Sequence, residues 1–199
     1  MLTNRPPPRR VAWRDGWWWR ALEVPSPNHN ERPPGATVSL AVVHSISLPP
    51  GRYGGDAIER LFTNRLDWGA HPYFESIRGL RVSTHFLIRR SGRLLQFVSC
   101  DRRAWHAGAS TWRDRPNCND YSIGIELEGL EGERFMAAQY TQLAALLRAL
   151  SRRYAIDAVV GHEHVAPSRK HDPGAGFDWT RLARALRWSR ERVPFAAQH

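Results

Sequence analysis

The sequence contains no apolar run approaching the ~20 residues that a membrane-spanning helix needs. Its basic, proline-rich beginning, MLTNRPPPRRVAWRDGWWWRALEV, also lacks the continuous apolar core and the small-residue cleavage site of an export signal. Only two cysteines are present, Cys100 and Cys118, and they form no CxxC pair. We therefore expect a cytoplasmic protein with no membrane partner, whose two thiols stay reduced and bind no metal.

Long blocks of like charge are missing as well, although the net charge is +10 and the pI is near 10.8. The arginines are dispersed in pairs such as Arg89-Arg90 and Arg152-Arg153, a pattern typical of a solvated surface. A basic balance still indicates an anionic partner, which could be nucleic acid, a membrane surface or a small acidic substrate. Charge alone does not choose among these, and we expect no dedicated nucleic-acid binding.

The chain is long enough for one well-buried domain. Its 199 residues are 42% hydrophobic and 11% aromatic, which argues against a disordered or fibrous protein. We place an irregular lead-in at residues 1–16, a single domain at 17–190 and a tail at 191–199. Residues up to about 37 are expected to be mostly irregular, with a short helical turn at 17–22, and the chain is expected to fray after Pro194.

Strand-like and helix-like patterns alternate along the rest of the chain. Strands are predicted at 38–44, at 121–129 and just before His162, and a β-hairpin is predicted around a two-residue turn at Ser91-Gly92. Helices are predicted from N-capping residues Asp56 and Asp178 and over 136–154. The pattern indicates a mixed α/β fold, in which helices flank a central mixed β-sheet.

The segment VVGHEHVAPSRKHDPG, residues 159–174, combines three histidines with a carboxylate. His162 and Asp172 are suitable zinc ligands, and His44, at the end of the first strong strand, is the best placed third ligand. The segment is not the helical H-E-x-x-H motif, because Ala166 stands where its second histidine would be. Spacing alone leaves two possibilities open: a zinc site, or histidines with core or surface roles.

Longer segments resemble one known family. They are LAVVHSISLPPGRYGG, HPYFESIRGLRVSTHFLIRRSGRLLQFVSCDRRAWHAGAS, CNDYSIGIELEG and GHEHVAPSRKHDPGAGFDW. Together, from about Trp17 to Trp188, they resemble the AmpD family of 1,6-anhydro-N-acetylmuramyl-L-alanine amidases, in the zinc amidase superfamily that also contains the peptidoglycan recognition proteins. The resemblance implies the fold of this superfamily, with a single domain. It also implies a cytoplasmic enzyme of peptidoglycan recycling. Such an enzyme hydrolyses the amide bond between (1,6-anhydro)-N-acetylmuramic acid and L-alanine. By removing these fragments it would influence β-lactamase induction in bacteria that use them as signals.

The resemblance also implies a role for particular residues. Zn²⁺ would be bound by His44, His162 and Asp172. Glu126 would be the general base and acid, and Lys170 would stabilise the oxyanion. The substrate would be a small anionic muropeptide, in keeping with the basic charge, and it would contact Arg81, Trp105, His106 and Arg169.

Three positions depart from the family pattern. Ser45 stands where asparagine is frequent, His171 stands where threonine is frequent, and His164 adds an imidazole. We expect His164 or His171 either to contact a ligand residue or to compete for the metal. Two other functions stay open. A noncatalytic peptidoglycan-binding module would not need the complete catalytic set, and a nucleic-acid-binding protein would show affinity that falls steeply with salt.

Overall fold

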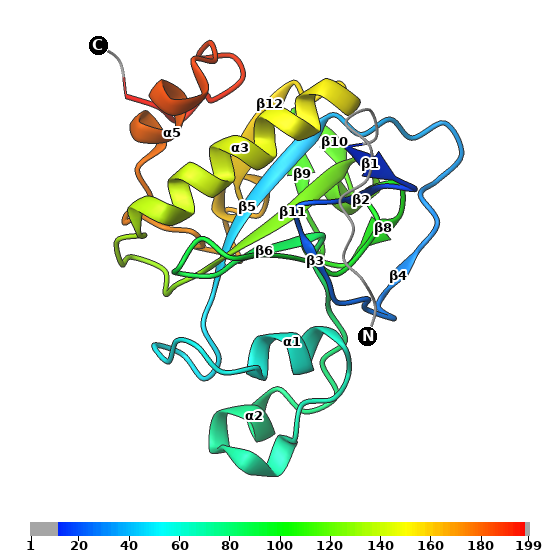
Figure 1. Ribbon diagram of the computed structural model, residues 1–199, viewed down its shortest axis with the longest axis vertical. Coiled ribbons are helices and arrows are strands. Elements are labelled where there is room, and N and C mark those ends of the chain that lie inside the picture. The colour runs from blue at the N-terminus through cyan, green and yellow to red at the C-terminus, as the bar shows by residue number, and fades with distance from the viewer. Residues whose placement is uncertain (1–11, 198–199) are drawn as a thin grey trace.

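The computed structural model describes residues 12–197, and its centre is a six-stranded sheet in the order β12-β5-β11-β6-β7-β3 (Figure 1). Strands β12, β5, β11 and β6 are parallel, β7 is antiparallel to β6, and β3 is parallel to β7. The predicted mixed α/β fold is confirmed. The strands are β3 (Leu22–Glu23), β5 (Leu40–Ile46), β6 (Phe86–Ile88), β7 (Leu94–Gln96), β11 (Ser122–Glu128) and β12 (Ala158–Gly161).

Within the described residues, three short antiparallel pairs lie outside this sheet. They are β1 (Trp13–Arg14) with β2 (Trp17–Trp18), β4 (His29–Asn30) with β8 (Arg103–Ala104), and β9 (Thr111–Trp112) with β10 (Arg115–Pro116). The helical turn predicted at 17–22 is wrong, because this segment pairs as a hairpin and then enters the main sheet as β3. Asp15 and Gly16 cause this, since both have positive φ (48° and 76°), as two-residue hairpin turns require.

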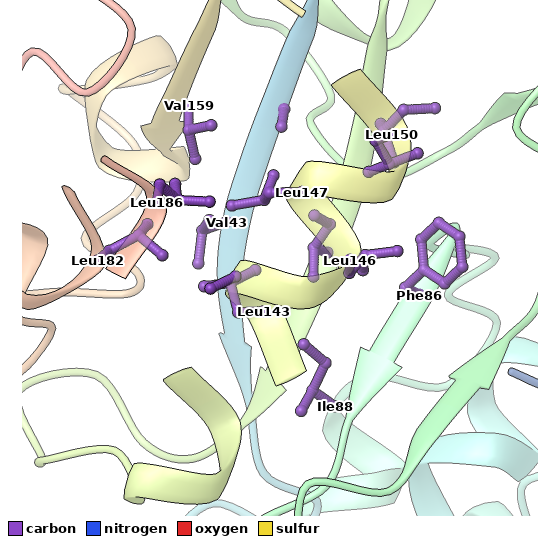
Figure 2. Packing of buried hydrophobic residues seen from close by; sticks show 14 of the residues in the cluster. Val43, Phe86, Ile88, Leu143, Leu146, Leu147, Leu150, Val159, Leu182 and Leu186 are labelled. Carbon is purple, nitrogen blue, oxygen red and sulfur yellow. The ribbon is translucent and has the colours of Figure 1, made fainter. Parts of the chain in front are cut away.

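Helices α3 (Ala137–Arg153) and α5 (Trp179–Leu186) cover one face of the sheet (Figure 1). Both helices were predicted, and the Asp178 carboxylate caps α5 by accepting the Arg181 N–H at 2.8 Å. Burial of each leucine on this face contributes about 1.5–3 kcal/mol. Figure 2 shows the packing, which involves Val43, Phe86, Ile88, Leu143, Leu146, Leu147, Leu150, Val159, Leu182 and Leu186.

The other face of β6 and β7 packs against α1 (Ala57–Phe62), with the turn η1 (Trp68–Ala70) and α2 (Pro72–Ser76) nearby. The side chains of Leu87, Leu95 and Phe97 are buried in the hydrophobic cluster on this side of the sheet. The helix predicted from Asp56 is present but short. Its end at Phe62 is followed by Asn64 in the left-handed region (φ 57°), and the Asp56 carboxylate contacts Arg60 at 2.7 Å instead of capping the helix.

The predicted hairpin between β6 and β7 is confirmed, but its connection has three residues. The Arg89 N–H donates to the Arg93 carbonyl at 2.9 Å and the Gly92 N–H donates to the Arg89 carbonyl at 2.8 Å. The turn therefore spans 90–92 and ends in Gly92 at a φ of 85°, the usual position for glycine in a three-residue hairpin.

The prediction that the chain frays after Pro194 is wrong for residues 195–197. Phe195 stacks on His164, and the Ala197 N–H donates to Thr180 Oγ1 at 2.9 Å. The rest of the tail, 198–199, and residues 1–11 of the lead-in lie outside the described residues. The domain limits at 17 and 190 stay predictions.

The thiols of Cys100 and Cys118 are buried and not bonded to each other, as predicted. Within residues 12–197, no helix has the length and apolar character that crossing a bilayer would demand.

Candidate metal centre and active site

Parallel pairing brings the predicted catalytic residues together. Glu126 on β11 lies directly opposite His44 on β5, and Gly161 on β12 lies opposite Val43, so His162 follows at the same level. Because strand side chains alternate between faces, His44 and Glu126 point away from the core face that holds Val43 and α3. The site therefore lies on the face opposite α3 and α5.

Three potential ligand atoms converge at this level. His44 Nδ1 lies 3.0 Å from His162 Nδ1 and 3.1 Å from Asp172 Oδ2, and His162 Nδ1 lies 3.2 Å from Asp172 Oδ2. A tetrahedral zinc ion with bonds of about 2.0–2.1 Å separates its ligand atoms by roughly 3.3 Å. This is the one metal-binding group of histidine, cysteine, aspartate and glutamate found among residues 12–197. The donor set and spacing fit Zn²⁺.

The charges of these groups also suit a divalent metal. Burial and the neighbouring charge of His162 lower the pKa of His44 to about 4. Burial alone would raise the pKa of Asp172, but its contacts with His162 and His44 hold that pKa well below its usual range. The site thus offers neutral imidazole and ionised carboxylate, the protonation states that metal ligands need.

The segment that carries His162 is a single helical turn, α4 (His162–Val165). In a helical turn, residues two apart point to different sides, so His164 does not face the metal ligands. Its Nδ1 accepts the Gly161 N–H at 2.8 Å, and its ring stacks on Phe195 with centroids 3.3 Å apart. His171 is exposed. Neither histidine belongs to the metal-binding group, so the expectation that one of them competes for the metal is not supported.

Glu126 is buried at 8% exposure, and within residues 12–197 its Oε2 has no hydrogen-bond partner. Burial, together with the negative charge of Asp172, raises the pKa of Glu126 well above its usual value, and the charge of Lys170 opposes this. An unpartnered buried carboxylate oxygen is costly, and here it borders the cavity beside the metal ligands. It is well placed to exchange a proton with a water molecule there.

This cavity has a volume of about 230 Å³ and is bordered by the metal ligands, Glu126, Ser45 and Lys170. Larger clefts of 710 and 590 Å³ lie beside α5, but none of the predicted catalytic residues borders them. Of the 29 lysine and arginine residues in the chain, Lys170 is the only lysine. A compact ammonium therefore stands at the active site of a chain that otherwise uses guanidinium.

The four residues predicted to contact substrate do not form one cluster. Trp105 borders the cavity and donates from Nε1 to Asn30 Oδ1 at 2.7 Å. His106 also borders the cavity, yet its Nδ1 lies 2.9 Å from His44 Nε2. The Arg169 guanidinium donates to the carbonyls of Ala107 and Ala109, and Arg81 is exposed and not among the residues that border the cavity.

Sequence reasoning missed an apolar wall of this cavity. The exposed fractions of Tyr73 (37%) and Leu80 (44%) are high for such side chains, and HPYF at 71–74 was the only available signal. The wall comes from the last residue of β5 and from the segment between β5 and β6, and no local pattern reveals that this segment lies beside the cavity. It consists of Ile46, Leu48, Leu61, Phe62, Tyr73, Ile77, Leu80 and Val82.

Comparison with known proteins gives consistent results. The family model for N-acetylmuramoyl-L-alanine amidase matches residues 34–175. The chain is 53% identical to the 1,6-anhydro-N-acetylmuramyl-L-alanine amidase AmpD of Citrobacter freundii over 174 residues, 86% of this chain and 92% of that protein. It is also 53% identical to the same amidase of Escherichia coli K12, over 84% of this chain and 92% of that protein.

Solved structures agree with these relatives. A crystal structure of AmpD matches with a TM-score of 0.85 and 52% identity, covering 87% of this chain and 98% of that one. Escherichia coli AmiD, in complex with the substrate anhydro-N-acetylmuramic acid-L-Ala-D-gamma-Glu-L-Lys, matches with a TM-score of 0.56 and 28% identity. That match covers 78% of this chain and 60% of AmiD.

Proposed function

Because the chain belongs to the N-acetylmuramoyl-L-alanine amidase family, it is an amide hydrolase, and we propose that it hydrolyses the bond between 1,6-anhydro-N-acetylmuramic acid and L-alanine with a bound zinc ion. The observation that carries this proposal is the meeting of three potential metal-ligating atoms at one cavity with the Glu126 carboxylate, whose Oε2 has no hydrogen-bond partner within residues 12–197.

In this proposal His44, His162 and Asp172 hold the zinc. When bound, the ion acts as a Lewis acid that polarises the scissile carbonyl and acidifies water. The neutral His44 imidazole and the ionised Asp172 carboxylate are already in the required states, as the lowered pKa values of these two groups indicate.

Glu126 moves the proton. Its carboxylate accepts a proton from the attacking water and returns it to the amine of L-alanine as the C–N bond breaks. Burial raises the pKa of Glu126 above that of an ordinary carboxyl, which makes it a stronger base toward water than an exposed glutamate. Lys170 donates to the oxygen on which negative charge develops during the attack.

The remaining roles concern the substrate. A stem peptide carries carboxylates, so Arg81 and Arg169 are proposed to bind it, and Trp105 is proposed to contact the sugar. The apolar wall that includes Leu80 and Val82 would exclude water from one side of the reacting amide. AmiD, solved with an anhydromuropeptide substrate, supports this substrate class. A cytoplasmic location stays a prediction from the sequence and from the family resemblance.

The variant Glu126→Gln tests the catalytic assignment directly. We expect it to bind zinc and an anhydromuramyl tripeptide like the parent, while kcat falls by about 10²–10⁴-fold because the proton carrier is lost. Turnover is measured by mass detection of released tripeptide, and Glu131→Gln on the surface is the matched control. A Glu126→Gln protein that cleaves at the parental rate would remove Glu126 from the mechanism. Substrate binding without any cleavage by the zinc-loaded parent would instead indicate a noncatalytic binding module.

A further inference from the structure

His106 is tied into a line of hydrogen-bonding groups that begins at the metal ligands. His44 Nε2 lies 2.9 Å from His106 Nδ1, and His106 Nε2 lies 3.1 Å from Ser122 Oγ. The rings of the two histidines meet edge to face, with centroids 5.1 Å apart. The mechanism proposed above does not use this line.

Metal binding by His44 would determine which ring nitrogen carries the proton in both His44 and His106. If His44 binds through Nδ1, that nitrogen carries no proton, so the proton of the neutral ring is on Nε2. Among residues 12–197, the only group facing this Nε2 at hydrogen-bond distance is His106 Nδ1, which must then be the acceptor. The proton of His106 is therefore on Nε2, where it donates to Ser122 Oγ.

The surroundings hold the His106 ring in this position. A Cβ at Gly124 would lie 2.4 Å from His106 Cγ, so only glycine leaves room for the ring against β11. The backbone N–H groups of His106 and Ala107 both donate to Asn119 Oδ1, at 3.2 and 2.8 Å. The Arg32 guanidinium in turn donates to the carbonyls of Asn119 and Ser122, at 3.1 and 2.9 Å.

We propose that His106 is a positioning residue for the metal site. Its Nδ1 accepts the Nε2 proton of His44 and so fixes the tautomer and ring orientation in which His44 presents Nδ1 to zinc, while Ser122 fixes the tautomer of His106 itself. This assignment differs from the substrate contact implied by the family resemblance, and it rests on the proposed zinc site. Hydrogen-bond partners of this kind typically change metal affinity by about 10–100-fold.

Three variants test whether His106 acts as a hydrogen-bond acceptor or only fills space by packing. His106→Phe keeps a ring of similar shape but has no acceptor, His106→Asn places an amide oxygen near the former Nδ1, and Ser122→Ala leaves His106 free to change tautomer. Zinc affinity is measured at fixed pH by competition with a chromophoric chelator, after circular dichroism has shown that each variant is folded. We expect about 10–100-fold weaker zinc binding in His106→Phe, a smaller loss in Ser122→Ala, and substantial recovery in His106→Asn relative to His106→Phe.

The outcomes distinguish this inference from the proposed function. Parental zinc affinity in His106→Phe, with only KM raised, would make His106 a substrate contact and overturn the inference while the amidase stands. Equal losses in the Phe and Asn variants would assign it a packing role and also overturn it. A parent that binds no zinc would end both proposals.

A measurement on the parent needs no variant. In the zinc-loaded protein, long-range ¹H–¹⁵N NMR correlations should show the protons of both His44 and His106 on Nε2. A proton on His106 Nδ1 would contradict the inference.

Discussion

At the scale of single residues, the site contains a buried carboxylate, Glu126, that lowers the stability of the fold but is needed for the proposed reaction. The Glu126 carboxylate is buried next to the charge of Asp172, and its Oε2 lacks a partner among residues 12–197. Such groups cost stability, and functional sites commonly retain them at that expense.

Glu126→Gln should therefore stabilise the metal-free protein while it removes activity. The folded state holds the Glu126 proton more tightly than the unfolded chain, whose carboxyl has the ordinary pKa of 4.5. The unfolded state is thus increasingly favoured as the pH rises from about 4.5 toward the raised folded pKa. Thermal melts of metal-free parent and variant should differ above this range and converge at low pH. A variant that melts below the parent at pH 7 would contradict the burial argument.

Lys170 allows a second prediction, about the oxyanion. Lys170→Met keeps the length of the side chain but removes its charge, so kcat should fall by about 10²–10³-fold with zinc affinity retained. Lys170→Arg restores a cation and should recover part of the rate, because the bulkier guanidinium places its charge differently. Steady-state kinetics on an anhydromuramyl tripeptide measure both. An unchanged kcat in Lys170→Met would exclude the assigned role.

At the scale of elements, the short helix α4 carries two histidines, one in the metal-binding group and one in a structural contact. His162 faces the metal group, whereas His164 anchors the C-terminal segment through Phe195 and lies near Trp179, with centroids 5.4 Å apart. Burial lowers the pKa of His164 to about 4. Because the unfolded chain binds this proton below about 6.5, stability is lost as the pH falls from 6.5 toward 4.

Phe195→Ala should expose the His164 ring and move its pKa upward from about 4 toward 6.5. It should also cost about 0.5–1.5 kcal/mol beyond the lost burial. An NMR titration of the His164 ring protons measures the pKa, and Phe195→Leu, which still covers the ring, is the control. A pKa that stays near 4 in Phe195→Ala would show that another group buries His164.

The elements also show what the sequence could and could not predict. The leucine stripe of α3 and the alternation of β11 are local patterns, so both elements and the direction of Glu126 followed from them. Turn chemistry decided the failures: Asp15-Gly16 makes a hairpin where a helical turn was predicted, and α1 ends early before Asn64. The metal ligands came from the family resemblance, because spacing alone left structural histidines open. Contacts between distant segments, such as His106 with His44 or the apolar wall with the cavity, have no local signal.

At the scale of the whole molecule, one face of the central sheet packs against the hydrophobic core and the other face carries the proposed catalytic residues. Residues alternate along β5 and β11, so Val43 and Ile125 join the core under α3 while His44 and Glu126 face the cavity. Changes on the core face should therefore act on stability and leave the site intact.

Leu147→Ala, in the core between α3 and the sheet, should lower the free energy of unfolding by about 2–5 kcal/mol. At temperatures where the variant is folded, its zinc affinity and kcat should match those of the parent. Denaturant unfolding and kinetics at low temperature test the two halves of this prediction. A large drop in kcat of the folded variant would show that the two faces are coupled.

The central claim is that a zinc ion held by His44, His162 and Asp172 is needed for hydrolysis of the muramyl-alanine amide. The most direct measurement is to incubate the purified protein with an anhydromuramyl tripeptide before chelation, after chelation and after zinc is restored, and to identify products by mass. Free tripeptide should be released, release should stop on chelation, and it should return with Zn²⁺. Cleavage that continues in demonstrably zinc-free protein, or no cleavage by folded, zinc-loaded protein, would contradict the account.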